Sequence, residues 1–234
     1  LDKSGIWEGF IPGIAVGSCY KYHIMDGEGR CFYKSDPYAF CFEKRPANAS
    51  VTFTTEYKWN DEQWMKCRFS NNALSSPWNV YELHVGSWMR PDRNNKEFFH
   101  SYNTIADLLI DYVKDMGFTH VEFMPIMEHP LDASWGYQCT GFFAPTSRYG
   151  NPDECKYLID RLHQNGIGVV LDWVPSHFPG DAHGLYCFDG AHTYEYADRR
   201  RGFHPDWNSF IFKIGNGDNR QWVFKTIANK LIGN

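Results

Sequence analysis

The sequence predicts an α/β protein in which a β-rich segment precedes a parallel sheet. The first third of the 234 residues contains short aromatic-rich runs separated by turn residues, a pattern typical of strands. From Val80 onward, short apolar runs alternate with two segments of helical periodicity. This β-α-β-α-β order indicates parallel strands joined by right-handed crossovers.

The β-rich segment centres on a predicted hairpin. "SCYKYHIM" and "RCFYKSD" flank the turn sequence "DGEG" at residues 26–29, and "ASVTF" at residues 49–53 predicts a further strand. Residues 54–79 show no clear period, and "SNNALSSPW" within them predicts a linker or surface loop.

The first helix is predicted over residues 104–116, with Gly117 as its stop. Its apolar residues recur at i, i+3, i+4, i+7, i+8 and i+11, which predicts one buried face. These residues are Ile105, Leu108, Leu109, Tyr112, Val113 and Met116.

The second helix is predicted to begin at Asn151, a capping residue, with Pro152 in the first helical position, and to stop at Gly166. Its buried stripe is Cys155, Leu158, Ile159 and Leu162. Strands are predicted at residues 80–86, 119–125 and 167–174. The last, "IGVVLDWV", is nearly all apolar, as in a strand covered on both faces. A final helix is predicted over about residues 220–231.

Composition narrows the classes of partner. The net charge of −5 and the lack of a Lys/Arg block argue against nucleic acid, and no apolar run is long enough to predict a membrane span. Seven cysteines, an odd number without a C-x-x-C pair or zinc spacing, favour a reduced, cytoplasmic protein. His177 and His183 have no partner at a zinc-site spacing, so no metal site is expected. No cofactor is predicted.

Candidate site residues lie where predicted strands end, since parallel α/β folds gather functional groups there. Asp172 ends the third strand, on the same side as Val170, and His177 is expected in the following loop. The Gly- and Pro-rich loop at residues 128–150 carries Trp135 and Tyr137, whose ring faces suit sugars. The alternatives are that Asp172 ties down its own loop and that a ring packs beneath the other loop.

Long segments resemble the 1,4-α-glucan (glycogen) branching enzymes of the α-amylase superfamily. They are "YELHVGSW", "GFTHVEFMPIMEHPLDASWGYQCTGFFAPTSRYG", "KYLIDRLHQNGIGVVLDWVPSHFPGDAHGL" and "FDG". "GIWEGFIPG", "KSDPYAF" and "RPANASV" resemble that family's β-sandwich carbohydrate-binding module. The resemblance implies part of this module at residues 1–70. At residues 71–234 it implies about three βα units from the N-terminal half of a (β/α)8 TIM barrel.

The same resemblance implies site roles. Tyr137 matches the tyrosine that stacks on glucose at the cleavage site, Asp172 the aspartate that holds that subsite, and His177 a histidine that hydrogen-bonds the same sugar. The implied reaction is a retaining double displacement that transfers an α-1,4-glucan segment to a glucose 6-hydroxyl.

No segment matches the family's nucleophile motif, so the resemblance implies a fragment that is inactive alone, with no catalytic residue assigned. A glycosyltransferase fragment of glycogen metabolism is therefore expected, with α-1,4-glucan as partner. The alternatives are a non-catalytic glucan-binding protein and a hydrolytic or debranching relative.

Overall fold

The computed structural model describes residues 9–95 and 98–214. In its N-terminal part, strands β2 (Tyr22–Met25) and β3 (Cys31–Lys34) form an antiparallel hairpin, which confirms the predicted one. The Asp26 carboxylate accepts hydrogen bonds from the Glu28 and Arg30 backbone N–H groups and so closes the turn. Strand β1 (Cys19–Tyr20) pairs antiparallel with β4 (Ser50–Val51). Strand β4 falls inside the strand predicted at residues 49–53.

A helix, α1 (Glu62–Asn71), lies within residues 54–79, where the sequence shows no clear period, and its last two residues overlap the predicted linker or loop. It has no apolar stripe, since Trp64 is its one buried residue, so periodicity could not reveal it. Contacts with another helix hold it instead: Trp64 stacks on His163, and the His163 ring nitrogen lies 2.7 Å from the Asp61 carboxylate.

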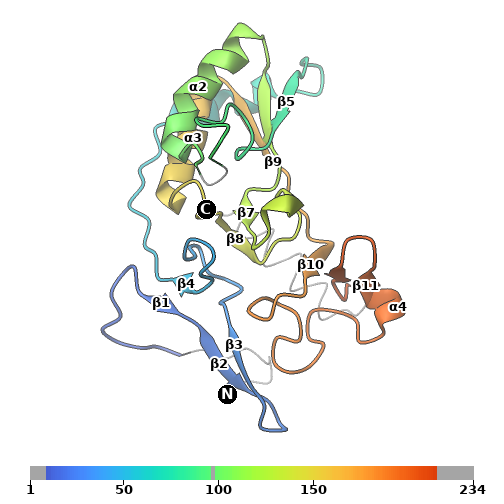
Figure 1. The fold of residues 1–234 in the computed structure, drawn as a ribbon. Helices are drawn as coiled ribbons and strands as arrows, with labels where there is room; N and C mark the ends of the chain where they lie inside the picture. The colour runs from blue at the N-terminus through green and yellow to red at the C-terminus, as the bar shows by residue number, and fades with distance from the viewer. Residues whose placement is uncertain (1–8, 96–97, 215–234) are drawn as a thin grey trace.

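The parallel sheet has the strand order β5 (Val80–Leu83), β6 (His120–Phe123) and β9 (Gly168–Leu171), as predicted. Leu83, Phe123 and Leu171 stand in register. Helices α2 (Tyr102–Asp115) and α3 (Pro152–Gln164) connect the strands and lie side by side along one side of this sheet (Figure 1). The main hydrophobic core fills the space between these helices and the sheet.

The buried face of α2 differs from the predicted one at two positions. Leu108 is 41% exposed and Met116 is 53% exposed. The buried face of α2 includes Tyr102, Ala106 and Ile110, and Leu108 lies outside it. Met116 is exposed at the C-cap, where the helix ends. The prediction was wrong for these two residues because apolar spacing cannot tell which flank of the stripe meets a neighbouring helix.

Helix α3 begins as predicted. The Asn151 side chain accepts from the Glu154 N–H and the Glu154 carboxylate accepts from the Asn151 N–H, a full capping box with Pro152 at the start. Gly166, just past the helix, has a φ of 74°, the left-handed conformation that glycine adopts at a helix end. Cys155, Leu158 and Leu162 are buried, and Ile159 is partly buried against the same core.

The remaining elements lie in the segments that follow β6 and β9. Strands β7 (Met127–Glu128) and β8 (Gly141–Pro145) pair across the 3-10 turn η1 (Asp132–Ser134). After β9 come β10 (His177–Pro179), the short helix α4 (Arg199–Gly202), β11 (Phe203–His204) and β12 (Ser209–Ile211). The last three strands form one small sheet in the order β10-β12-β11.

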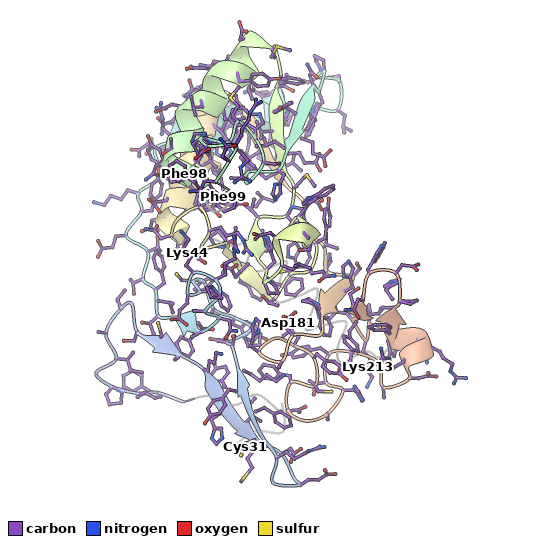
Figure 2. The ribbon with its side chains drawn as sticks, in the orientation of Figure 1. Cys31, Lys44, Phe98, Phe99, Asp181 and Lys213 are labelled. Carbon is purple, nitrogen blue, oxygen red and sulfur yellow. The ribbon has the colours of Figure 1, made fainter. Side chains whose placement is uncertain are left out.

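The N-terminal hairpin contacts the segment after β10. The Lys34 ammonium donates to the Tyr186 carbonyl at 2.7 Å, and the Ser35 N–H donates to the His183 carbonyl at 2.9 Å. Asp181 lies near this junction (Figure 2) and lines a pocket together with Glu43 and Arg45 of the N-terminal part. Within residues 9–95 and 98–214, no helix combines the length and apolar character needed to cross a membrane. The final helix predicted at about residues 220–231 lies outside the described residues.

Candidate functional site

One face of the parallel sheet carries acidic side chains. Leu83, Val121 and Phe123 are buried in the core toward the helices, so strand alternation places Glu82, Glu122 and Val170 on the opposite face. Glu82 is exposed and Glu122 is half-buried. We call this side, with Asp172 just beyond β9, the acidic sheet face.

Asp172 continues this face past the end of β9. Its backbone N–H donates to the Phe123 carbonyl at 3.0 Å, so the pairing with β6 extends to this residue. The two-residue alternation then puts its carboxylate on the same side as Val170, as the sequence predicted.

Gly136 sets the path of the loop that carries Tyr137. Its φ is 91°, and a Cβ atom there would lie 2.0 Å from the Pro125 carbonyl oxygen, so only glycine fits. Trp135 before it also has a left-handed φ, of 55°. This close approach to the end of β6 places the next residue above the acidic sheet face.

The Tyr137 hydroxyl donates to the Asp172 carboxylate at 2.7 Å. Burial, this hydrogen bond and the nearby carboxylates, including those of Glu82 and Glu122, raise the pKa of Tyr137 to about 12. The phenol therefore stays protonated and remains a hydrogen-bond donor at neutral pH. The Asp172 carboxylate therefore holds a different loop from its own.

His177 lies on strand β10, not in a loop as expected, because its backbone pairs with Ile211 of β12. It is only 5% exposed, and its Nδ1 atom is buried with no hydrogen-bond partner among the described residues. Burial, with the neighbouring His204, lowers the pKa of His177, so the ring is neutral at pH 7. A buried polar atom without a partner is uncommon in a folded protein, so this nitrogen marks an unfilled interaction beside Trp207.

Trp207 links the two predicted parts of the site, and the sequence analysis missed it. Its ring packs on His177 at a centroid distance of 5.3 Å, and its carbonyl accepts from the Gln138 side chain at 2.7 Å. Gln138 follows Tyr137 directly, so the Tyr137 loop and β10 meet at Trp207. The residue is 56% exposed, and the aromatic residue in "HPDW" was the only signal in the sequence.

Trp135 presents its ring to solvent beside Tyr137, with 59% of the residue exposed. It does not pack beneath the loop, so the core alternative does not hold for this ring. Trp135 and Trp207 are therefore the two exposed indoles next to the Tyr137–Asp172 pair and His177.

A buried ion network holds the Tyr137 loop from below. Arg148, with a side chain only 2% exposed, donates to Glu128 at 2.9 Å and to Asp132 at 2.7 Å. Arg45 of the N-terminal part donates to the other Asp132 oxygen at 2.7 Å. Asp132 begins the turn η1 that leads to Trp135, so the network fixes the start of the loop.

This arrangement suits a ligand with apolar ring faces and many hydroxyl groups. Exposed indoles offer flat apolar surfaces, and the phenol and the carboxylates offer hydrogen bonds. The residues that the sequence predicted as one site therefore lie on neighbouring elements: Trp135, Tyr137 and Asp172 at the acidic sheet face, and His177 behind Trp207.

The comparisons with known proteins define the class. The model of the alpha amylase catalytic domain matches residues 87–212, more than half of the chain, and that of carbohydrate-binding module 48 (isoamylase N-terminal domain) matches residues 1–39. The chain belongs to the α-amylase family. A putative alpha amylase from Salmonella typhimurium shares the fold, with a TM-score of 0.70 over 95% of this chain and 34% of that one at 24% identity.

Among curated proteins, the chain is similar to 1,4-alpha-glucan branching enzymes GlgB. It is 56% identical to that of Aquifex aeolicus over 96% of this chain and 35% of the relative, and 52% identical to that of Gloeobacter violaceus over 98% and 31%. The chain therefore spans about a third of the length of these relatives.

Proposed function

We propose that this chain contributes one wall of the glucan-binding site of a 1,4-α-glucan branching enzyme. The main observation in support of this proposal is the Tyr137–Asp172 hydrogen bond at the acidic sheet face, in a chain 56% identical to a branching enzyme. The proposed reaction transfers an α-1,4-glucan segment to a glucose 6-hydroxyl by retaining double displacement. The attacking and proton-donating carboxylates are proposed to come from outside the matched residues 87–212.

Each proposed binding residue has one role. Tyr137 stacks its ring on a glucose unit, with Asp172 holding its hydroxyl. His177 binds a hydroxyl of the same sugar, and the exposed Trp135 offers a ring face to a neighbouring unit.

The proposed organisation divides the chain near residue 70. Residues 1–70 would be part of a carbohydrate-binding module, and residues 71–234 part of the catalytic barrel. The antiparallel pairing of β1 to β4 supports the first assignment and the parallel order β5-β6-β9 the second.

The proposed setting is the cytoplasm, with an α-glucan as partner and neither nucleic acid nor a membrane surface involved. Seven free cysteines and a net charge of −5 support this proposal.

A chimera tests the function. Residues 1–212 of this chain would replace the aligned part of the Aquifex aeolicus relative, and the purified protein would be given amylose. New α-1,6 linkages, measured by proton NMR, should rise while reducing ends stay nearly constant. A second chimera would exchange only residues 87–212. If it is active and the first is not, the fault lies in the junction with the N-terminal module and not in the proposed site.

Three other results would point elsewhere. A rise in reducing ends without branches would favour a hydrolytic relative. Amylose binding without turnover would favour a non-catalytic glucan-binding protein. A folded chimera that neither binds nor reacts would contradict the proposed site.

A further inference from the structure

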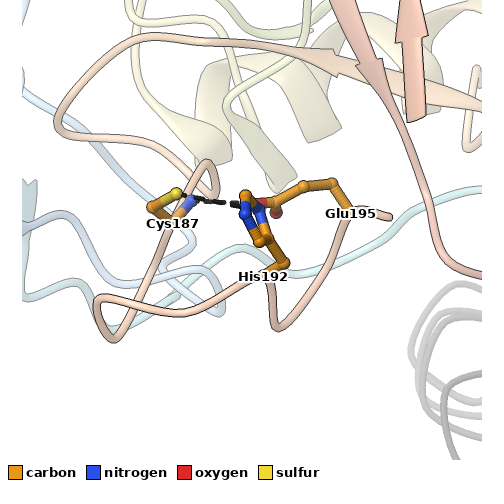
Figure 3. Close-up of side chains that lie close together, drawn as sticks. All are labelled: Cys187, His192 and Glu195. Carbon is orange, nitrogen blue, oxygen red and sulfur yellow. Dashed lines mark hydrogen bonds and ion pairs between the residues drawn. The ribbon is translucent and has the colours of Figure 1, made fainter. Parts of the chain in front are cut away.

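A cluster of three potential metal ligands lies in the segment between β10 and α4, apart from the acidic sheet face. Cys187, His192 and Glu195 place one ligand atom each within 4.8 Å of one another (Figure 3). His192 Nδ1 lies 2.8 Å from Glu195 Oε1 and 3.9 Å from Cys187 Sγ. Thiol, imidazole and carboxylate thus converge from three different positions of one loop.

These separations are close to those around a tetrahedral zinc ion. Bonds of about 2.3 Å to sulfur and about 2.0–2.2 Å to nitrogen and oxygen place neighbouring ligand atoms about 3.3–3.6 Å apart. The imidazole and carboxylate would need to separate by about half an ångström, and the thiol would need to approach by less than that. The thiol and the Glu195 carboxylate lie within 4.8 Å of each other and would need to approach by at most about 1.2 Å.

Glu195 supplies the second, independent observation. Its side chain is 1% exposed, and Oε1 accepts from the Cys187 N–H at 3.1 Å and from the His192 ring. The other oxygen, Oε2, is buried without a hydrogen-bond partner among the described residues. A buried carboxylate oxygen with no partner is costly, so this group has an unfilled interaction.

The nearest buried cation does not fill it. Lys34 is 2% exposed and close enough for its charge to act on Cys187 and Glu195, but its ammonium donates a hydrogen bond to the Tyr186 carbonyl. The backbone beneath the cluster is fixed, because Glu195 forms a β-bridge with Phe212. The ligands therefore rest on ordered structure.

We propose that Cys187, His192 and Glu195 form a site for a borderline-soft divalent cation, Zn²⁺ being the best fit. A thiolate with an imidazole selects zinc over calcium or magnesium, which prefer oxygen ligands. His192 has a side chain 40% exposed, which leaves a solvent side where water completes the tetrahedron. On binding, the thiol releases its proton to solvent. The neutral ring loses its Nδ1 proton and takes one up at Nε2 from solvent, so that Nδ1 can bind the ion. The spacing C-x4-H-x2-E fits no common zinc pattern, so the sequence did not predict it.

The test uses the 234-residue chain, freed of metal with a chelator and then dialysed against ZnCl2 or CoCl2. One zinc ion should bind per chain, and cobalt should give a sulfur-to-metal charge-transfer band. Cys187→Ser should abolish the band. His192→Ala should weaken zinc binding at least about ten-fold, because the loss of a residue that only hydrogen-bonds a metal ligand already lowers metal affinity by about that factor. Cys67→Ser on α1 is the matched control and should change neither.

Protection from alkylation locates the ion without relying on affinity. Zinc should block reaction of Cys187 with N-ethylmaleimide, read by peptide mass spectrometry, while leaving Cys67 reactive. Circular dichroism would verify that each variant is folded. No zinc binding by the unsubstituted chain, equal binding by folded Cys187→Ser, or unprotected Cys187 would each overturn the proposal.

Discussion

Replacing Arg148 with methionine should destabilise the fold far more than the same change at Arg45. Arg148 is 2% exposed at its side chain and pairs with Glu128, which is 9% exposed. Removing one member of a buried pair typically costs about 3–5 kcal/mol, because the other charge is left buried. Four donors from His129, Thr146 and Ser147 would still solvate Glu128, so we expect about 3 kcal/mol, the low end of that range.

Arg45→Met is the matched control. Its pair with Asp132 has side chains 25% and 46% exposed, and such pairs contribute about 0–1 kcal/mol. Urea unfolding followed by tryptophan fluorescence measures both variants, with the denaturant slope required to stay constant. Equal losses for the two variants, or a loss under about 1 kcal/mol for Arg148→Met, would refute the claim that the buried network holds the Tyr137 loop.

Three further outcomes follow from single positions. Gly136→Ala should unfold the chain or cost several times the roughly 1 kcal/mol expected for Gly117→Ala in urea titrations, since both have positive φ but only Gly136 meets the Pro125 carbonyl. Similar costs would contradict this. Burial lowers the pKa of His129 to about 4, below the unfolded value of about 6.5, so the unfolded chain binds the proton first as pH falls. The free energy of unfolding should therefore drop by about 3 kcal/mol from pH 6.5 to 4. His129→Asn should make the free energy of unfolding less dependent on pH over this range, and an unchanged pH dependence would contradict the assignment to His129. Trp207→Ala in the chimera should raise the KM for amylose with the fold retained, and an unchanged KM would remove Trp207 from the site.

The sequence predicted the elements whose local signals agree with their packing. The capping box at Asn151 and the turn at Asp26 are local, so they could be read directly. Helix α1 has no such pattern, because only Trp64 is buried and its anchor, His163, lies about a hundred residues away. No local rule shows a contact of that kind.

The candidate site could be predicted only where residues follow strand ends. Asp172 and Tyr137 were found in this way, and the structure joins them by a hydrogen bond. The strand position of His177 depends on its pairing with Ile211, and the role of Trp207 depends on the return of the chain to that strand. Both are long-range consequences of the fold.

The most direct test of the proposed glucan site is the kcat/KM of the chimera after Tyr137→Phe, with amylose as substrate. This change keeps the ring but removes the hydroxyl that donates to Asp172. The matched control is Tyr57→Phe, which removes a tyrosine hydrogen bond to Asp160 of α3.

A hydrogen bond to a charged group is worth about 1.5–3 kcal/mol, so kcat/KM should fall about ten- to hundred-fold for Tyr137→Phe. It should stay unchanged for Tyr57→Phe, and both proteins should remain folded. An unchanged kcat/KM for folded Tyr137→Phe, or equal losses in the two variants, would contradict the assignment of the acidic sheet face as the glucan-binding site.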